Sequence, residues 1–395
     1  MEQPFFTQTM LVYLFYPLGC RAGQQIAMIE YLEIEGFKSI KQLQIELRPI
    51  NVLIGSNGAG KSNFVSFFKL LNALYNQRLA NFTLNEGVDN VFHFGRKTTE
   101  SLYGKLIFSR SGIDTNNAYW FQLTPNQHGG LFVDSEGYGY NVDPEDDRYN
   151  YFVEHDLMES LLLNKQDYRY DYIKSYLSGI QMYHFHDTSN TSRLRTPCEI
   201  EDNLALAFDG RNLPAFLFYL QEQEPKRFRR LVKVIQSIAP YLDRFILQPS
   251  RHNPQEIALR WSEKGDPESS FSAYQLSDGT LRFIALATVL MQPNPPEVII
   301  IDEPELGLHP QAITKLAGLI RMVSNTTQLI ISTQSVNLVS CFEPEDIITV
   351  DRSQAENQSI FRRLAPESLN DWLKDHTLGE LWDRNIIDSA QPFPQ

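Results

Sequence analysis

The chain is poor in cysteine. Its 395 residues include only 3 cysteines, Cys20, Cys198 and Cys341, which lie far apart in the sequence. A disulfide framework or a structural zinc site needs cysteines at short, repeated spacings, so neither is indicated. Scattered free cysteines are typical of proteins in a reducing compartment, and we therefore expect a cytoplasmic protein.

Long hydrophobic runs are also missing. The apolar segment at residues 10–16 is far too short to span a bilayer, and no lysine or arginine precedes it. It is therefore a poor match to a signal peptide as well. No other segment approaches transmembrane length, and we expect no membrane association.

Positive charge is in short supply. The chain has 35 lysines and arginines against 48 acidic residues, a formal net charge of −13. Non-specific DNA binding depends on clustered cations that displace counterions, so this balance weakens the case for DNA as a partner. One basic cluster lies on a predicted helix and consists of Lys226, Arg227, Arg229, Arg230 and Lys233. It is either a solvated helix face or a patch for nucleic acid or a protein.

The most informative stretch is GSNGAGKS at residues 55–62. It fits the pattern G-x-x-x-x-G-K-[ST], with Gly55, Gly60, Lys61 and Ser62 at the fixed positions. An apolar run at residues 50–54 predicts a buried strand before it, and apolar residues at helical spacing predict a helix over 63–81. Strand, glycine loop and helix together predict a phosphate-binding loop.

The chemistry of this loop predicts ATP and Mg²⁺ as cofactors. Lys61 is expected to reach the β- and γ-phosphates, and the Ser62 hydroxyl to hold Mg²⁺. Backbone N–H groups around the curled loop supply the remaining phosphate contacts. The expected nucleotide-binding residues are Gly55, Ser56, Asn57, Gly58, Ala59, Gly60, Lys61, Ser62 and Asn63.

A second apolar run, VIIIDE at residues 298–303, ends in two acids. This pattern predicts a buried parallel strand that delivers carboxylates at its carboxyl end. Asp302 is expected in the Mg²⁺ shell, and Glu303 is expected to polarise the attacking water.

Residues 276–280 read LSDGT and precede a predicted apolar helix over 281–291. Ser277 is expected to cap this helix and to leave its first N–H groups available to an anion. The LSDGT segment is called the signature segment below.

The order GSNGAGKS, LSDGT, VIIIDEPELGLHP, LIISTQS resembles an ABC-type ATPase head of the SMC/RecF-like kind. The runs YHFHDTS at 183–189 and DGRNL at 209–213 narrow the resemblance to the bacterial single-head "predicted ATPase" (AAA family ATPase) group. The resemblance implies an α/β fold: a P-loop NTPase with a mixed or parallel sheet core, an antiparallel β lobe and a compact helical insert.

The same resemblance implies a homodimer that forms on ATP. Ser277 and Gly279 would contact the γ-phosphate held by a second subunit, and the loop ELGLHP at 305–310 would lie at the contact between subunits. Asp278 replaces the family's first glycine and puts an acid near the phosphates unless it points away. Gln334 stands where the family usually has a histidine that senses the γ-phosphate. The expected catalytic residues are therefore Glu303, Lys61 and Gln334. His309 is an alternative base that the motif favours less than Glu303.

The expected organisation has four parts. Residues 1–27 form an extension, expected to be poorly ordered, before a natural start at Met28. Residues 28–150 form the first half of the core, with β-rich runs over 103–140 and a boundary loop at 143–147. Residues 151–250 form a mainly helical insert without heptads, in which Pro214 and Pro225 start helices. Residues 251–395 complete the core.

His184 and His186 share one face of a predicted strand over 181–186, and Asp187 follows. Two histidines and one acid are an incomplete metal set, so a structural or phosphate-proximal role competes with metal binding.

Three functions fit these observations. The first is an ATP-driven switch whose heads close on ATP and act on DNA or a protein partner. The second is the ATPase component of an antiphage or toxin-like system that works with a separately encoded nuclease. The third is the ATP-binding subunit of a transporter, which the opening EYLEIEGFKSI and the unusual signature segment disfavour.

Overall fold

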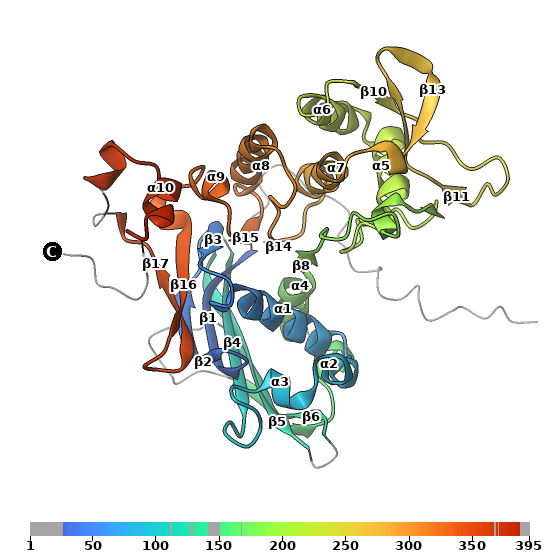
Figure 1. The fold of residues 1–395 in the computed structure, drawn as a ribbon. Coiled ribbons are helices and arrows are strands. Elements are labelled where there is room, and N and C mark those ends of the chain that lie inside the picture. The colour runs from blue at the N-terminus through green and yellow to red at the C-terminus, as the bar shows by residue number, and fades with distance from the viewer. Residues whose placement is uncertain are drawn as a thin grey trace, which may run out of the picture.

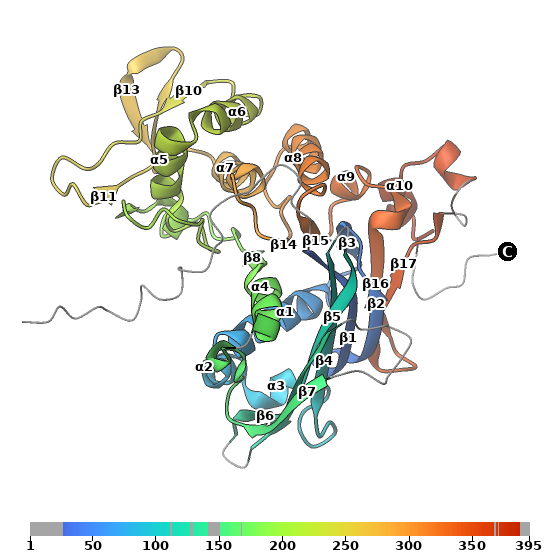
Figure 2. The same cartoon turned by 180° about the vertical axis from the view of Figure 1, so that it is seen from behind.

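The computed structural model describes residues 27–110, 113–126, 129–140, 151–166, 168–366, 369 and 371–387. The expected extension, apart from residue 27, and the expected boundary loop at 143–147 lie outside the described residues. Figures 1 and 2 show a central sheet with an antiparallel β lobe on one side of it and a smaller lobe of helices and short strands on the other.

The central sheet has the strand order β17-β16-β3-β15-β14-β8. The four neighbouring pairs from β16 to β8 are parallel, and only β17 runs antiparallel to its neighbour β16. The strands are β3 (Ile50–Ile54), β8 (Ile180–Tyr183), β14 (Val298–Asp302), β15 (Gln328–Thr333), β16 (Ile347–Ser353) and β17 (Gln358–Arg363). The predicted mixed or parallel core sheet is therefore confirmed.

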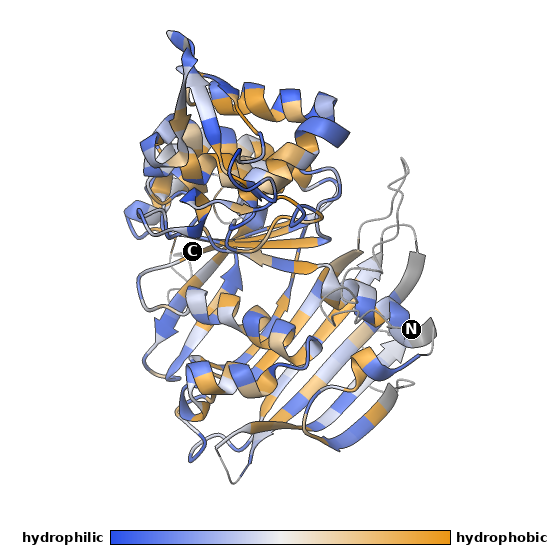
Figure 3. Ribbon diagram, turned by 90° about the vertical axis from the view of Figure 1, so that its right-hand side faces the viewer, coloured by the Kyte–Doolittle hydropathy of each residue, from blue (hydrophilic) through white to orange (hydrophobic). Residues whose placement is uncertain are grey.

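Alternation along the strands explains why both faces of this sheet are buried. In β14, Ile299 and Ile301 face one hydrophobic core, and Val298 and Ile300 face another. A parallel sheet covered on both faces needs such continuous apolar runs. Figure 3 shows the hydrophobic colouring of these central strands.

One face of the sheet is covered by α1 (Lys61–Tyr75), which begins within the phosphate loop. The sequence predicted a single helix over 63–81, and this is wrong at its C-terminal end. The helix ends at Tyr75, Gln77 has a left-handed φ of 55°, and the chain restarts as α2 (Leu79–Glu86) and α3 (Val88–Val91). A residue in the left-handed region cannot continue a right-handed helix.

The opposite face is covered by helices from the C-terminal half of the chain. These are α7 (Asp278–Met291), α8 (Pro310–Val323), α9 (Val336–Val339) and α10 (Leu378–Asp383).

Short 3₁₀ helices are formed elsewhere in the chain by Leu162–Asn164, Arg193–Arg195, Ala273–Gln275, Pro344–Asp346 and Trp372–Lys374. Within the described residues, no helix combines the length and the apolar character that crossing a membrane requires.

The β lobe is a six-stranded sheet with the order β2-β1-β4-β5-β6-β7, antiparallel throughout. Its strands are β1 (Ala27–Phe37), β2 (Ile40–Glu46), β4 (Leu102–Arg110), β5 (Ile113–Pro125), β6 (Leu131–Tyr140) and β7 (Tyr151–Leu157). The predicted β-rich runs over 103–140 form β4 to β6. The mainly helical insert predicted for residues 151–250 instead begins with β7, which pairs with β6.

The smaller lobe lies between β8 and α7 in the chain. It contains α5 (Leu213–Gln223) and α6 (Pro225–Gln236), with prolines in their first turns as predicted. Two small sheets accompany them: β9 (Cys198–Glu199) with β11 (Glu256–Ile257), and β10 (Leu242–Phe245), β12 (Arg260–Glu263) and β13 (Asp266–Ser272). The preceding helix α4 (Tyr168–Ser178) packs against α1 instead.

Candidate functional site

The parallel strands deliver the predicted site residues to one edge of the central sheet. Ile54 of β3 pairs with Thr333 of β15, and Ser332 pairs with Asp302 of β14. The phosphate loop, Gln334 and Glu303 follow these three strand ends directly. Segments that are hundreds of residues apart in the chain therefore meet at the carboxyl edge, where ligands of open α/β sheets bind.

Lys61 is buried at the start of α1, and its ammonium group bonds the loop itself. Its Nζ donates to the Gly55 carbonyl at 2.6 Å and to the Ser56 carbonyl at 3.0 Å. Burial lowers the pKa of Lys61, while Glu303 and Asp302 act in the opposite direction. These carboxylates help to keep a buried lysine charged, as phosphate binding requires.

Two loop glycines have no space for a side chain. A Cβ on Gly55 would lie 2.1 Å from the Val350 carbonyl oxygen, and one on Gly60 would lie 2.1 Å from Ser359 Oγ. Ser359 also donates a hydrogen bond to the Ala59 carbonyl at 2.5 Å. Strand β17 therefore packs against the phosphate loop through Ser359. The sequence of the loop does not predict this contact.

The predicted Mg²⁺ ligands have suitable chemistry. The Ser62 side chain is exposed at the first turn of α1, and Asp302 keeps one carboxylate oxygen beyond the bond that its Oδ1 accepts from Ser332 Oγ at 2.5 Å. A hydroxyl and a carboxylate are oxygen donors of the kind that Mg²⁺ takes together with substrate phosphates. The residues present fit the metal.

Glu303 and Gln334 lie in direct contact. Gln334 Nε2 donates to Glu303 Oε1 at 2.6 Å. Glu303 also has a left-handed φ of 42°, a strained conformation of the kind that concentrates at functional sites. Both side chains line a cavity of about 520 Å³ together with Asn57 of the phosphate loop. A water held in this cavity would lie between a carboxylate and the loop.

Glu305 belongs to the loop predicted at the subunit contact, but sequence reasoning missed its role within the site. It is mostly buried and accepts hydrogen bonds from Thr333 Oγ1 at 2.5 Å and from the Gln334 backbone N–H at 3.2 Å. Burial raises the pKa of Glu305. It holds the main chain of Gln334, but a second acid two positions after Glu303 carries no signal for this in the sequence.

Ser277 is the N-cap of α7, as predicted. Its hydroxyl accepts from the Thr280 backbone N–H at 3.2 Å, and the side chain is exposed. Gly279 lies against the loop at 305–310, because a Cβ there would be 2.4 Å from the Gly307 carbonyl oxygen. Among the described residues, no hydrogen bond joins Ser277 or Gly279 to the phosphate loop of the same chain.

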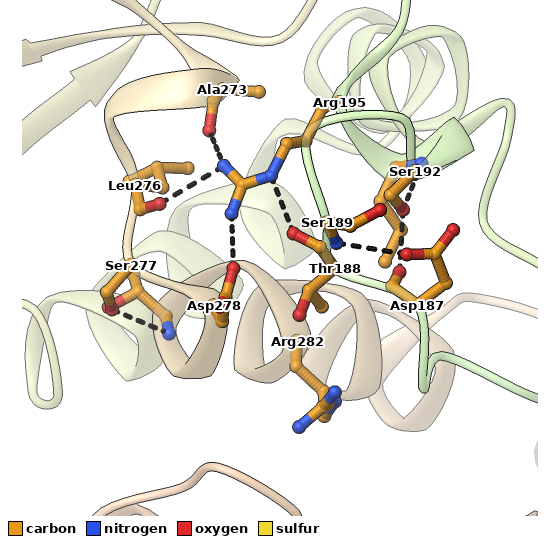
Figure 4. Close-up of polar contacts among 12 residues, drawn as sticks. Asp187, Thr188, Ser189, Ser192, Arg195, Ala273, Leu276, Ser277, Asp278 and Arg282 are labelled. Carbon is orange, nitrogen blue, oxygen red and sulfur yellow. Dashed lines mark hydrogen bonds and ion pairs between the residues drawn. The ribbon is translucent and has the colours of Figure 1, made fainter.

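Arg195 binds the signature segment from within the chain (Figure 4). Its side chain is only 4% exposed, and its Nη2 donates to Asp278 Oδ1 at 2.6 Å. The same guanidinium donates to the main-chain carbonyls of Thr188, Ala273 and Leu276. Asp278, the third residue of the signature segment, is therefore paired within its own subunit, and nothing in the signature sequence indicates this partner.

His184 and His186 lie just beyond β8, which ends at Tyr183 and so is shorter than the predicted strand. The rings are 4.1 Å apart, and His186 Nε2–H donates to the Asp302 carbonyl at 2.8 Å. Arg282 of α7 donates in turn to the main-chain carbonyls of Phe185 and His186. Within the described part of the chain, no group of three or more His, Cys, Asp or Glu side chains could hold a metal ion.

Comparison with known families shows a match that covers most of the chain. The profile of a family described as "AAA domain, putative AbiEii toxin, Type IV TA system" matches residues 50–340. The matched range includes the phosphate loop, the signature segment, Asp302, Glu303 and Gln334.

Two curated relatives are both named energy-coupling factor transporter ATP-binding protein EcfA2. The protein from Lactobacillus delbrueckii subsp. bulgaricus is 27% identical over 135 residues, which are 33% of this chain and 45% of that protein. The protein from Staphylococcus aureus is 31% identical over 109 residues, which are 26% of this chain and 36% of that protein. The chain thus spans less than half the length of either relative.

Solved structures with a similar fold include Smc heads. The SmcHead bound to the C-winged helix domain of ScpA superposes with a TM-score of 0.58 at 17% identity, covering 87% of this chain and 99% of that one. An Smc head domain with an extended coiled coil, bound to the C-terminal domain of ScpA derived from Pyrococcus furiosus, gives 0.55 at 16% identity, covering 89% and 99%. This similarity confirms the predicted P-loop NTPase fold.

Proposed function

The chain belongs to the AAA-domain family described as a putative AbiEii toxin of a type IV toxin–antitoxin system, and from this membership we propose that it hydrolyses ATP to ADP and phosphate as a dimeric molecular switch. It is a P-loop ATPase of the ABC/SMC type by family and fold. Catalysis, the dimer and the partner are parts of the proposal.

The observation that carries the proposal is the convergence of Lys61, Glu303 and Gln334 at one edge of the sheet. Lys61 and the loop N–H groups would bind the phosphates, and Ser62 and Asp302 would hold Mg²⁺, which neutralises charge on the phosphates when bound. Glu303 would accept a proton from water in the cavity that it shares with Asn57. Gln334 would orient that carboxylate through the 2.6 Å hydrogen bond.

Dimerisation is supported by the position of the signature segment. Ser277 is exposed at the N-terminus of a 14-residue helix, where backbone N–H groups and the helix dipole favour an anion. Because Ser277 makes no hydrogen bond to its own phosphate loop, we propose that this helix end binds the γ-phosphate held by a second copy.

The proposed partner is DNA or a protein that contacts the smaller lobe. The cations of α6 are exposed, while Leu231 and Ile235 on the same helix are buried. This surface fits a polyanion or an acidic protein. The similar Smc head is bound to a domain of ScpA, which favours a protein partner by analogy of fold alone.

A second candidate function follows from the family description. As a member of a putative AbiEii toxin family, the chain could serve as the ATPase of an antiphage or toxin-like system whose nuclease is encoded separately. A transporter role is third, because the EcfA2 relatives match over a third of the chain or less.

The substitution Glu303→Gln tests the switch. It keeps the shape and the contact with Gln334 but removes the proton acceptor, so hydrolysis should fall by about 10²–10⁴-fold while Mg–ATP binding persists. Gel filtration with Mg–ATP should then show a dimer that is absent without nucleotide. The control is Glu345→Gln, which alters an exposed acid on a distant 3₁₀ helix and should leave hydrolysis unchanged.

The possible outcomes separate the parts of the proposal. If the Glu303→Gln variant hydrolyses ATP at the wild-type rate, Glu303 is not the base that accepts the proton from water. If the variant binds Mg–ATP but stays monomeric, the result contradicts the proposed head-to-tail dimer and leaves the proposed ATPase activity intact. Affinity capture with the trapped variant, compared with Glu345→Gln, then identifies whether DNA or a protein is retained.

A further inference from the structure

A second cavity, of about 670 Å³, adjoins the phosphate loop. It contacts the loop at Gly58 and Asn63, whereas the cavity that contains Glu303 and Gln334 contacts the loop at Asn57. A di- or triphosphate bound in the loop has two ends. The end near Glu303 is the one that reacts, so the ribose and base must leave from the other end, toward Asn63. The cavity's volume is in the usual range for small-molecule sites.

An exposed aromatic side chain forms part of this cavity. Phe94 is 57% exposed, although most phenylalanines of the chain are buried in its two large cores. Its backbone has a left-handed φ of 56°, a strained conformation that is uncommon for a bulky residue. Folding alone gives no reason to hold a phenylalanine in solvent at a strained position.

The segment that carries Phe94 is held by hydrogen bonds to residues 36 and 38 and by a bond within its own turn. His93 N–H donates to the Gly36 carbonyl at 2.9 Å, and His93 Nδ1–H donates to the Lys38 carbonyl at 2.8 Å. Within the turn itself, Gly95 N–H donates to the Phe92 carbonyl at 3.1 Å. The His93 ring is buried and packs edge-on against Phe94 at 4.4 Å between centroids. Phe94 is therefore presented on a rigid support.

The charges around the cavity suit a nucleotide more than an apolar ligand. Lys38 Nζ is already bound by Glu86 at 2.7 Å and by Ser66 at 2.8 Å. Arg352 enters the cavity from β16, with its Nη1 donating to the Ser39 carbonyl at 3.2 Å. An aromatic face and an arginine in one cavity, next to a phosphate loop, are a combination that binds a planar base joined to phosphates.

We propose that this cavity is the nucleobase site of the ATPase and that Phe94 is its stacking platform. The purine ring lies on the Phe94 face, and Arg352 lies on the ribose side of the same cavity. The inference rests on the proposed function, since it names where the base of the bound nucleotide lies. It also predicts that the base contributes affinity beyond that of the phosphates.

The test compares Mg–ADP with inorganic pyrophosphate in the presence of Mg²⁺, by titration calorimetry. Both ligands carry a diphosphate, but only ADP carries a base, and neither has the γ-phosphate that dimer closure requires. Loss of one base–aromatic stack should weaken Mg–ADP binding to Phe94→Ala by roughly 5- to 150-fold. Pyrophosphate affinity should be unchanged.

Two further variants isolate the ring. Phe94→Leu keeps an apolar side chain without an aromatic face and should bind Mg–ADP almost as weakly as Phe94→Ala. Phe94→Trp keeps the face and should bind within about 3-fold of the wild type, because stacking tolerates any aromatic ring. Its added fluorescence, measured against the four tryptophans of the wild type, should be quenched by ADP and not by pyrophosphate.

The outcomes distinguish this inference from the function beneath it. If the wild-type chain binds neither Mg–ADP nor pyrophosphate, both the base site and the proposed ATPase function are wrong. Wild-type chain that binds both, with Phe94→Ala unchanged toward ADP, overturns the base site alone. Parallel loss of ADP and pyrophosphate in Phe94→Ala also overturns it, because Phe94 would then act only by supporting the phosphate loop.

Discussion

The Arg195 guanidinium lies 2.6 Å from the Asp278 carboxylate, and the two residues are 83 positions apart in the chain. Arg195 is buried, whereas the Asp278 side chain is 64% exposed. The ion pair therefore joins a fixed cation to a carboxylate at the surface. It turns the acid of the signature segment toward its own subunit, which answers the concern that Asp278 would repel a phosphate bound beside Ser277.

The two partners of this pair are expected to respond unequally to substitution. Arg195→Ala removes the donor of the Thr188 and Leu276 carbonyls, while the Ala273 carbonyl keeps the Leu276 N–H, and should cost on the order of 3 kcal/mol. Asp278→Asn alters only the exposed partner and should cost about 1 kcal/mol or less. Thermal denaturation measures both. Equal losses in the two variants would show that the ion pair, and not the carbonyl contacts, dominates.

Gly279→Ala should separate the signature helix from the loop at 305–310. The new Cβ would lie 2.4 Å from the Gly307 carbonyl oxygen, and overpacking of this kind costs about 1–3 kcal/mol. Gly318→Ala is the matched control, because Gly318 lies inside α8 with nothing within 4 Å of its Cβ position. It should stabilise the chain by roughly 0.5–1 kcal/mol. Melting temperatures that fall for both variants would contradict this assignment.

Lys61→Ala should weaken the binding of Mg–ATP and abolish its hydrolysis. Removing one or two charge-assisted hydrogen bonds to phosphate should weaken Mg–ATP binding on the order of 100-fold and eliminate measurable hydrolysis. The control is Lys69→Ala, which removes an exposed lysine from the same helix. Phosphate release and calorimetric titration check the pair. Normal turnover by Lys61→Ala would exclude the phosphate loop as the catalytic site.

Glu136 should make the stability of the β lobe depend on pH. It is fully buried, accepts a hydrogen bond from Ser160 at 2.7 Å, and burial raises its pKa from 4.5 to about 7. The folded chain then holds this proton more tightly than the unfolded chain. The stabilisation is complete below pH 4.5 and is lost as pH rises through about 7, with a total on the order of 3 kcal/mol.

The neutral variant Glu136→Gln measures this effect. Thermal midpoints from pH 5 to pH 8 should fall more steeply for the wild type than for Glu136→Gln, since glutamine does not titrate. Parallel curves for the two proteins would place the pH dependence elsewhere in the chain.

The predictions that the sequence supported depend on short, continuous segments. The phosphate loop needs a strand, glycines and a helix in series, and β14 needs an apolar run that ends in acids, so both are visible within a few residues. The helix over 63–81 failed at its end because a left-handed Gln77 has no distinctive signal beside good helix formers.

Contacts between distant segments could not be predicted in the same way. Arg195 is one arginine among many until the fold brings it to the signature segment. Gly279 reads as a phosphate-contacting glycine, and only the structure shows that the Gly307 carbonyl also excludes a side chain there. Phe94 reads as an ordinary apolar residue, and its exposure distinguishes it only after folding.

The segment after β8 has contacts at both of its ends. Near its start, His186 holds the main chain of Asp302, and near its end, Arg195 holds the signature segment. In the proposed dimer, Asp302 serves the nucleotide bound by its own subunit, while Ser277 serves the nucleotide bound by the other. The segment from His186 to Arg195 would then connect the two ATP sites of the dimer. ATP bound at the first site would raise the affinity for ATP at the second, and the rate of hydrolysis would rise with ATP concentration with positive cooperativity.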